Sequence, residues 1–324
     1  MEPDTPPGNA SLPNSFSPLM KLDGIHHVTA ITGDAPRNLD FYSRVLGLRL
    51  VKKTVNQDDP TVYHLFYADD RGSPGSDLTF FEYPGAAPGR AGAGMVHRVV
   101  WRVGSEDALD FWADRLQGTL GDSEREPGRL VFSDPEGMGL ELAVVEASDE
   151  PLTATRADIP AEHALQGFDG VRAYSASPAR STGLLGETLG FRDTGNGAWE
   201  SRGASRGSFY AYDDPPAEPG IGGAGTVHHV AWASEMEDHE AWQKRVAEAG
   251  ARPTPIIDRF YFKSIYFREP SGVLFEIATK GPGFSADEDP EHLGERLSLP
   301  PNYESLRSQL EQVLTPLESR APAS

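Results

Sequence analysis

Hydrophobic and polar positions alternate in four short segments that resemble one another. The segments are LDGIHHVTA (22–30), AGMVHRVVW (93–101), FDGVRAYSA (168–176) and AGTVHHVAW (224–232). The first and third share Asp-Gly, whereas the second and fourth share Gly-x-Val-His and a final Trp. Alternation with a period of two predicts a half-buried strand, and self-similarity along a chain indicates structural repeats. The chain is therefore expected to contain four related modules.

Each predicted strand leads into a stretch with helical spacing of its apolar residues. The first stretch, 35–46, has Pro36 in its first turn and is followed by Gly47, which are typical start and stop signals. The others are expected at 105–116, 178–189 and 235–249. Strand-like runs follow every helix, and an acid-Pro-x-Gly turn joins two of them in the second and fourth modules. This order predicts an α+β protein of four βαβββ modules in two tandem pairs.

Changes in composition suggest the domain boundaries. They predict a disordered leader at 1–20, an N-terminal domain with modules one and two at 21–150, a linker at 151–165, a C-terminal domain with modules three and four at 166–283, and a tail at 284–324. The leader is rich in Pro, Ser and Asn and lacks the apolar stretch of a signal peptide. In the tail a helix is expected at 303–314, where packing on the outside of the protein is favoured over a lid or an oligomer contact.

Two glycine-rich pieces, 85–94 and 220–225, precede the second and fourth modules. The later piece, GIGGAG, fits the G-x-G-x-x-G pattern of dinucleotide-binding loops. That motif must follow a strand and open a helix, whereas here a predicted strand comes after it. Both pieces are therefore interpreted as flexible connectors.

The composition narrows the possible functions. The chain has 324 residues, 49 acidic and 29 basic side chains, a formal charge of −20 and no cysteine. The missing thiols exclude Cys-ligated zinc, iron–sulfur clusters and thiol catalysis, and the negative charge argues against nucleic acid or an anionic membrane as partner. No apolar run approaches the ~18 to 20 residues of a membrane helix, so a cytoplasmic protein is expected. Only six of the bases are lysine, which is typical of a halophilic host or of a GC-rich genome, and both explanations stay open.

One position of the repeat carries the candidate chemistry. It holds His27, Arg98, Ala173 and His229 in the four modules, and the last strand of module four adds Glu276 in an otherwise apolar run. Two imidazoles and one carboxylate form the facial triad that binds non-haem Fe(II) and leaves positions open for substrate and dioxygen. The same set also suits catalytic zinc. If the two histidines bind one ion, module one must pack against module four, which leaves module two against module three.

Two further carboxylates bear on this assignment. Glu141 is the equivalent of Glu276 in module two, where Arg98 stands in the ligand position, so an ion pair or an exposed face is the expected explanation for it. Glu82, near the end of module one, is the rival candidate for a fourth ligand. The two phenylalanines before it leave the phase of that strand open.

Several separate motifs, in the same order, resemble the ring-cleaving extradiol dioxygenases of the vicinal oxygen chelate (glyoxalase/bleomycin resistance/dioxygenase) superfamily, in the hydroquinone dioxygenase branch. They are GIHHVTAITGDAPRNLDFYSRVLGLRLVKKTVN (24–56), TVHHVAW (226–232), DRFYFKSIYFREPSGVLFEIAT (258–279) and GPGFSADEDPEHLGERLSLPP (281–301). The resemblance covers about residues 21–318. It implies cupped mixed sheets, Fe(II) held by His27, His229 and Glu276, cleavage of a hydroquinone or related aromatic diol with O2, and a possible homo-oligomer.

The resemblance also implies further catalytic residues around the metal. They are His26, Thr29, His228, Arg259 and Tyr266. Strand alternation places Thr29 on the same face as the ligand two residues before it. It points His26 and His228 away from the metal unless a β-bulge re-aims them. In the implied extradiol reaction iron carries the redox step and the protein contributes orientation, acid–base groups and water exclusion, with His228 or Tyr266 as candidate for proton transfer.

Two other functions on this scaffold stay open at this point. The first is a glyoxalase-like lyase or isomerase that uses zinc or nickel as a Lewis acid, and manganese is not excluded either. The second is a non-catalytic module that binds small molecules. A glyoxalase-like enzyme would prefer a fourth protein ligand, and a binding module has no need of the triad.

Overall fold

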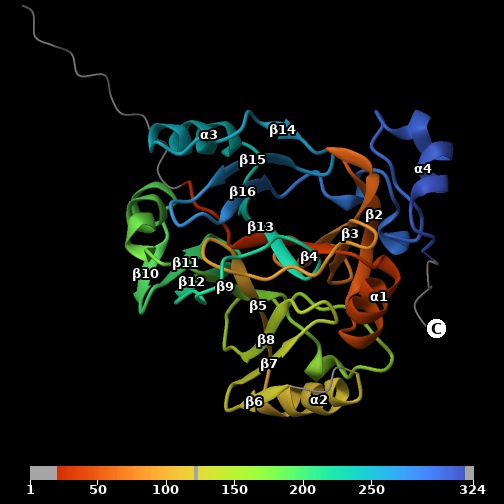
Figure 1. Ribbon diagram of the computed structural model, residues 1–324, viewed down its shortest axis with the longest axis horizontal. Coiled ribbons are helices and arrows are strands. Elements are labelled where there is room, and N and C mark those ends of the chain that lie inside the picture. Colours follow the sequence, from red (N-terminus) through yellow and green to blue (C-terminus); the bar gives the residue numbers. More distant parts are fainter. Residues whose placement is uncertain (1–19, 120–122, 318–324) are drawn as a thin grey trace, which may run out of the picture.

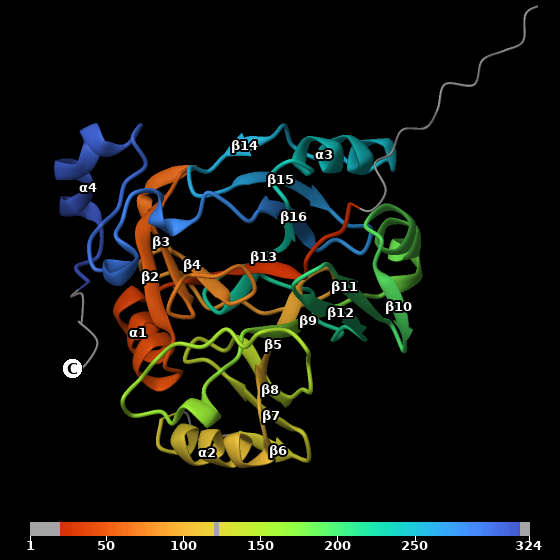
Figure 2. The same cartoon turned by 180° about the vertical axis from the view of Figure 1, so that it is seen from behind.

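The computed structural model of the protein describes residues 20–119 and 123–317. The predicted leader lies outside these ranges apart from Met20. Within the described residues the chain forms two eight-stranded mixed sheets with the helices packed on their outer sides (Figure 1). Seen from behind in Figure 2, α2 and α3 still lie on opposite sides of the molecule, each beside the sheet that its own module supplies. No helix of the described ranges is long and apolar enough to cross a membrane.

The first sheet combines module one with module four. Its strand order is β14 (Ile257–Asp258), β15 (Lys263–Arg268), β16 (Leu274–Thr279), β13 (Thr226–Ser234), β1 (Ile25–Thr32), β4 (Asp77–Glu82), β3 (Asp59–Ala68) and β2 (Arg49–Asn56). The contact between the two modules is the antiparallel pair of β1 and β13. The predicted packing of module one against module four is therefore confirmed.

The second sheet combines modules two and three in the same way. Its strand order is β10 (Arg192–Gly195), β11 (Ala198–Arg202), β12 (Gly207–Asp213), β9 (Phe168–Tyr174), β5 (Val96–Val103), β8 (Gly139–Val144), β7 (Arg129–Ser133) and β6 (Glu124–Glu126). Its modules meet through the antiparallel pair of β5 and β9. All four βαβββ modules are present as predicted. The predicted boundaries of the N-terminal and C-terminal domains stay a prediction. Each sheet contains one module from each half of the chain, so the sheets do not show where one domain ends and the next begins.

The predicted helices are all present, although two of them are irregular. The first is α1 (Ala35–Leu39) continued by the π-helical η1 (Asp40–Val45), and the second is α2 (Glu106–Gln117). The third consists of the 3-10 turn η3 (Pro178–Ser181) and the π-helical η4 (Gly183–Thr188). The fourth, α3 (His239–Glu248), begins later than expected because residues 236–238 form a turn. The linker holds η2 (Ala161–His163), and the tail holds η5 (Phe284–Ala286), η6 (Pro290–His292), η7 (Glu304–Leu306) and α4 (Arg307–Val313).

Tryptophans that recur in the repeat pack the helices onto the sheets. Trp101 on β5 and Trp112 on α2 are fully buried in one half of the core, and Trp232 on β13 and Trp242 on α3 are fully buried in the other. Burial of an indole removes a large apolar surface from water, and truncation to alanine at such a site costs about 3–5 kcal/mol. This packing occupies the helix-facing side of each sheet and leaves the opposite face of the first sheet for polar residues.

The two glycine-rich pieces do not behave as independent flexible connectors. They run beside each other, with a bridge between Arg90 and Ile221 and another between Pro88 and Ala224. A Cβ atom added at Gly92 would lie 2.2 Å from the backbone N of Gly220. Glycine is therefore required because two backbones approach closely, which composition alone does not reveal.

Candidate metal centre and its pocket

The candidate metal ligands lie on one face at the centre of the first sheet. Pairing of β1 with β13 sets His27 opposite Ala231, and pairing of β13 with β16 sets Ala231 beside Glu276. Tyr266 on β15 continues this row. Paired residues on neighbouring strands point to the same face, and so does His229, two residues before Ala231. The small methyl group of Ala231 leaves room for the three larger groups to converge above it.

Three ligand atoms meet at this point. Nε2 of His27 lies 3.3 Å from Nε2 of His229, and Oε2 of Glu276 lies 3.1 and 2.9 Å from the two nitrogens. All three side chains are buried, and Oε2 has no hydrogen bond of acceptable geometry among the described residues. Adjacent ligands of an ion with bonds of about 2.1 Å are separated by roughly 3 Å. The residues therefore fit a divalent metal ion between them.

The charge states of the site agree with metal binding. Burial alone would raise the pKa of Glu276, but the imidazoles of His27 and His229 hold that pKa well below its ordinary value. Burial lowers the pKa of His229, so its imidazole is neutral near pH 7. Ser264 donates a hydrogen bond to Oε1 of Glu276, which leaves Oε2 for the ion. A carboxylate and neutral imidazole are the forms in which these groups bind metals.

His26 and His228 both occupy β-bulges. The pairing of β1 with β13 skips His26 on one strand and His228 on the other. These bulges re-aim the two side chains, so that Nδ1 of His26 lies 2.9 Å from Nδ1 of His27 and Nδ1 of His228 lies 2.8 Å from Nδ1 of His229. Nε2 of His26 also lies 3.1 Å from the carbonyl oxygen of Thr279. Hydrogen bonds at Nδ1 orient each ligand ring with Nε2 toward the ion.

Thr29 lies on the ligand face, as strand alternation predicts. It is connected through Thr79 to His64, a histidine that the sequence interpretation missed. The hydroxyl of Thr29 is 2.8 Å from the hydroxyl of Thr79, which is 2.9 Å from Nε2 of His64 on β3. The His64 ring lies between the rings of Phe66 and Phe81, at centroid distances of 4.0 and 4.4 Å. The signal in the sequence that could have identified His64 is that it is a lone histidine in the apolar strand β3. Comparison of the four repeats does not single out this histidine.

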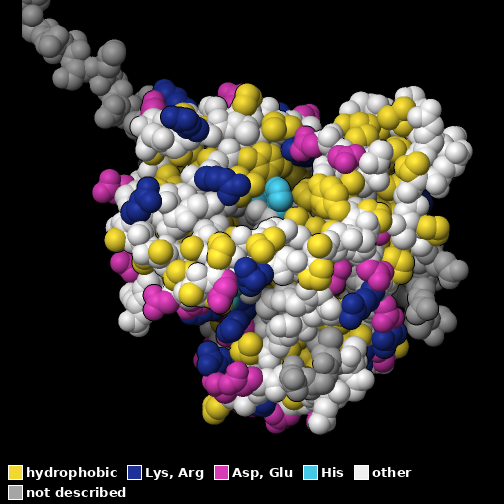
Figure 3. All heavy atoms as spheres, viewed as in Figure 1, with side chains coloured by type: hydrophobic (Ala, Val, Ile, Leu, Met, Phe, Trp, Pro, Cys, Tyr) yellow, Lys and Arg dark blue, Asp and Glu magenta, His cyan; other side chains and the backbone are white. Residues whose placement is uncertain are grey.

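A pocket of about 430 Å³ opens in front of the candidate metal centre. Figure 3 shows the hollow, with a histidine visible in it and hydrophobic side chains at its rim. Its aromatic lining includes Phe66, Phe81, Phe262 and Tyr266. The tip of the β2–β3 hairpin and the segment between β14 and β15 form opposite parts of its mouth.

Arg259 and Tyr266 both lie in this pocket, as the resemblance implies. Nε of Arg259 is 3.4 Å from the hydroxyl of Tyr266, and the guanidinium lies 5.4 Å from the centre of that ring. Burial raises the pKa of the Tyr266 phenol above its ordinary value, so the phenol keeps its proton. The terminal nitrogens of Arg259 donate to Asp58, a residue that the sequence interpretation did not single out.

The rival carboxylates are engaged elsewhere. Glu82 accepts hydrogen bonds from the backbone N of Ala35 at 3.1 Å and from the hydroxyl of Thr315 at 2.8 Å. Glu141 forms the expected ion pair with Arg98, at 2.9 Å. In the described part of the chain the cluster that could hold a metal contains only the three predicted ligands. Glu82 therefore lies outside this cluster.

Known proteins match most of the length of this chain. Residues 24–142 and 173–277 match the Glyoxalase/Bleomycin resistance protein/Dioxygenase superfamily. MhqO of Bacillus subtilis strain 168, provisionally named a ring-cleaving dioxygenase, is 43% identical over 93% of this chain and 98% of its own. The chlorohydroquinone/hydroquinone 1,2-dioxygenase of Sphingobium indicum is 31% identical over 90% of this chain and 95% of its own.

Solved structures show the same fold. A crystal structure of a provisionally named dioxygenase from Bacillus subtilis superimposes with a TM-score of 0.86 at 40% identity, over 93% of this chain and 99% of that one. Glyoxalase I from Zea mays matches with a TM-score of 0.57 at 16% identity, over 81% of this chain and 93% of that one. The second match supports the fold alone.

Proposed function

This chain belongs to the glyoxalase/bleomycin resistance protein/dioxygenase superfamily, and from that premise we propose that it is an Fe(II)-dependent extradiol-type dioxygenase that cleaves the ring of a hydroquinone or related aromatic diol with O2. The observation that carries the proposal is the convergence of two imidazole nitrogens and one carboxylate oxygen in an aromatic pocket. Two histidines and one carboxylate are the typical ligand set of non-haem Fe(II) oxygenases. The names of the relatives support ring cleavage, and one of them names a hydroquinone.

His27, His229 and Glu276 would hold the iron. When bound, Fe(II) supplies the redox chemistry between the diol ring and dioxygen, which protein side chains lack. The protein positions the ring. Phe81 and Phe262 offer apolar surfaces against which it can pack, and their bulk excludes water from the site.

Acid–base chemistry falls to two side chains of the pocket in this proposal. His64 lines the pocket and is the candidate to accept a proton from a diol hydroxyl. Burial lowers the pKa of its imidazole well below the ordinary value, so the ring is neutral before a substrate binds. Tyr266 stays protonated and can donate a hydrogen bond to an oxygen of the same ring. His228, the other candidate for proton transfer, is exposed and orients His229 through the hydrogen bond between their rings.

The alternative functions have less support from the site. A glyoxalase-like enzyme would prefer a fourth ligand, and Glu82 is bonded to the start of α1 and to the tail. Burying an ionised carboxylate is costly unless it has a partner. A module that only binds small molecules would have no reason to place such a group between two imidazoles.

Oxygen uptake after anaerobic loading with Fe(II) tests the proposal. We expect uptake of about one O2 per ring with hydroquinones or catechols, together with a ring-opened product. The matched comparison uses the same protein loaded with Zn(II) or Ni(II). Absence of uptake with every ring diol, combined with lyase or isomerase activity in the zinc or nickel form, would overturn the assignment.

A further inference from the structure

An ion pair spans the mouth of the pocket. Nη1 and Nη2 of Arg259, from module four, donate to Oδ1 and Oδ2 of Asp58, from module one, at 3.0 and 2.8 Å. Both residues line the pocket. The side chain of Arg259 is 15% exposed, whereas that of Asp58 is 73% exposed. The paired groups therefore connect the inner wall of the pocket with its outer rim.

The bidentate pair leaves Arg259 with little capacity for another anion. Its two terminal nitrogens both face the Asp58 carboxylate, and its Nε lies 3.4 Å from the Tyr266 hydroxyl. Gln57 fixes the backbone nearby, since its Nε2 donates to the carbonyl oxygen of Arg259 at 2.6 Å. Among the described residues that line the pocket, Arg259 is the only lysine or arginine. No other fixed cation is available there to receive a carboxylate carried by a substrate.

Fold stability does not account for this pair. An ion pair with one strongly exposed partner contributes about 0–1 kcal/mol, because water screens it and two side chains lose freedom. The ion pair matters more for which ligands the pocket can bind. A bidentate guanidinium is the side chain best suited to bind a carboxylate, and here that capacity is already occupied. An incoming anion that takes the same bidentate face of the guanidinium would have to displace Asp58 and would then meet the displaced carboxylate at the mouth.

We propose that Asp58, by occupying the guanidinium of Arg259, makes the pocket select aromatic diols whose other ring substituents are uncharged over diols that carry a carboxylate. This inference rests on the proposed function, whose substrate class it narrows. Asp58 acts in it as a positioning and specificity residue rather than as a group that takes part in the chemistry.

The test compares hydroquinone with 2,5-dihydroxybenzoate, which has the same two hydroxyls and one added carboxylate. In the wild-type protein kcat/KM is expected to favour hydroquinone by at least about 100-fold. Asp58→Asn should reduce this preference by about tenfold or more, chiefly by lowering KM for the carboxylated diol. Asp58→Glu, which restores the carboxylate, should restore the preference.

Asp59→Asn is the matched control. It removes the same charge one residue along, but the Asp59 carboxylate accepts from the backbone N and hydroxyl of Thr61, at 3.2 and 2.6 Å, on its own strand. The preference should stay within about twofold of wild type. An unchanged preference in Asp58→Asn would overturn the proposal, as would an equal shift in Asp59→Asn, because the effect would then be one of overall charge.

Calorimetric binding of both diols to the anaerobic protein, without turnover, separates this inference from the proposed function. If the wild-type protein turns over no ring diol, the proposed function fails, and the ratio of the two dissociation constants in wild type, Asp58→Asn and Asp59→Asn still tests Asp58. Loss of selectivity in Asp58→Asn alone supports the inference. Equal affinity of the wild-type protein for the two diols would overturn it.

Discussion

Each of the candidate ligands has its second polar atom bonded to a neighbour. Nδ1 of His27 and of His229 meet the rings of His26 and His228, and Oε1 of Glu276 accepts from a serine hydroxyl. The remaining polar atoms, Nε2 of each histidine and Oε2 of the glutamate, are the three that converge. Such support fixes the tautomer and orientation of a ligand before the ion arrives, which lowers the cost of ordering the site.

Replacement of Glu276 by glutamine tests this arrangement at the residue scale. The amide has nearly the same shape but lacks the charge that balances a divalent ion, so Fe(II) affinity should fall by at least about 100-fold. Calorimetric titration and iron content after desalting measure the loss. Glu141→Gln, the equivalent change in module two, should keep one iron per chain, because Glu141 pairs with Arg98. Retention of a full equivalent of tightly bound iron by Glu276→Gln would contradict the assignment.

His64 offers a second test on single residues. Replacement by asparagine keeps a polar side chain but removes the imidazole, so kcat should fall by about 10²–10⁴ if His64 transfers a proton. Iron content should not change, because His64 is not among the three converging groups. Thr79→Val, which removes only the hydroxyl near Nε2 of His64, should have a smaller effect. A kcat equal to that of wild type would assign proton transfer to another group.

At the scale of elements, the C-terminal strap, defined as residues 284–300, lies along β2 and contacts a residue that lines the pocket. Leu297 bridges to Lys53 in parallel fashion, and the backbone N of Ser298 donates to the carbonyl oxygen of Lys53 at 2.9 Å. Tyr261, which lines the pocket, donates to Asp287 in the strap at 2.9 Å. The strap thus packs against β2 and also contacts a residue of the site.

Lys52 anchors the strap, and its loss should detach it. The fully buried ammonium donates to the carbonyl oxygen of Phe284 at 3.1 Å, to Asp287 at 2.7 Å and to Glu288. Lys52→Met leaves the buried Glu288 with only the more distant Arg296, 3.9 Å away, as a cationic partner, and loss of one partner from a buried pair costs about 3–5 kcal/mol. Chemical unfolding and limited proteolysis within 284–300 should report the loss.

The matched control for the strap is the adjacent lysine. Lys53 is buried as well but forms no salt bridge in the described ranges, so Lys53→Met should cost much less. The double variant Lys52→Met/Glu288→Met should recover most of the lost stability, because it removes both charges together. If Lys52→Met and Lys53→Met were equally destabilising, the ion pairs of Lys52 would not be what holds the strap.

The repeat explains why so many elements could be predicted from the sequence. Four strands with one pattern fixed the modules, and the position of two histidines fixed which modules meet. The bulges at His26 and His228 could not be predicted, because they arise from the register between strands about 200 residues apart in the chain. For the same reason, the contact of Asp58 with Arg259 and the position of His64 could not be predicted from the sequence and became apparent only in the folded structure.

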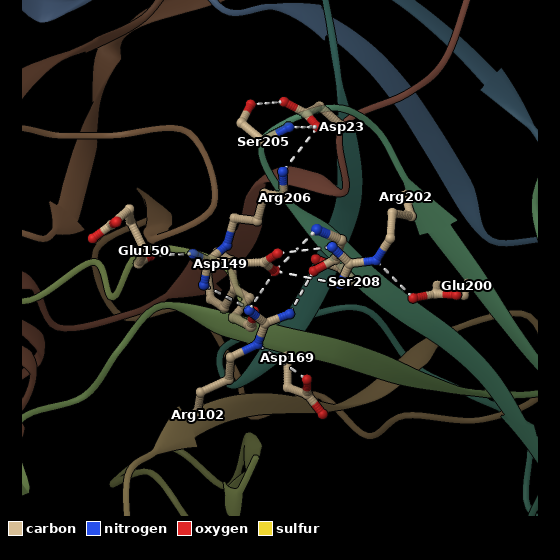
Figure 4. Close-up of polar contacts among 12 residues, drawn as sticks. Asp23, Arg102, Asp149, Glu150, Asp169, Glu200, Arg202, Ser205, Arg206 and Ser208 are labelled. Atoms are coloured by element: carbon tan, nitrogen blue, oxygen red, sulfur yellow. Dashed lines mark hydrogen bonds and ion pairs between the residues drawn. The ribbon is translucent and has the colours of Figure 1, made fainter. Parts of the chain in front are cut away.

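On the scale of the whole molecule, a buried charge network connects modules that lie in different sheets. Asp149, just before the linker, accepts from Arg102 of module two and from Arg202 of module three, at 2.7 Å in each case (Figure 4). Nearby, the backbone N of Arg206 donates to Asp23, just before β1, at 2.9 Å. The network therefore ties the start of the first sheet to the linker and the second sheet. In a chain with a net charge of −20, the network pairs the buried Asp149 with the buried Arg102 and with the more exposed Arg202.

Acid should weaken this network in a defined direction. Burial alone would raise the pKa of Asp149, but Arg202 and Arg102 hold it well below its ordinary value. The unfolded chain then takes up a proton more readily than the native protein, so the stability from Asp149 is complete at neutral pH and is lost as pH falls below about 4. This loss of stability continues as the pH falls through the lowered pKa of Asp149 in the native protein.

Asp149→Asn isolates this contribution. The Asp149 side chain is 3% exposed, and removal of one partner from a buried pair costs about 3–5 kcal/mol, so urea unfolding at pH 7 should show a loss of this size. Between pH 4 and pH 3 the gap to wild type should narrow, because the unfolded wild-type chain takes up a proton at Asp149 that the native protein does not. Asp110→Asn, in a surface pair whose carboxylate side chain is 68% exposed, should cost less than about 1 kcal/mol at either pH. A gap for Asp149→Asn that does not change with pH would mean that the amide disturbs packing, and that the negative charge of Asp149 is not what holds Arg102 and Arg202 together.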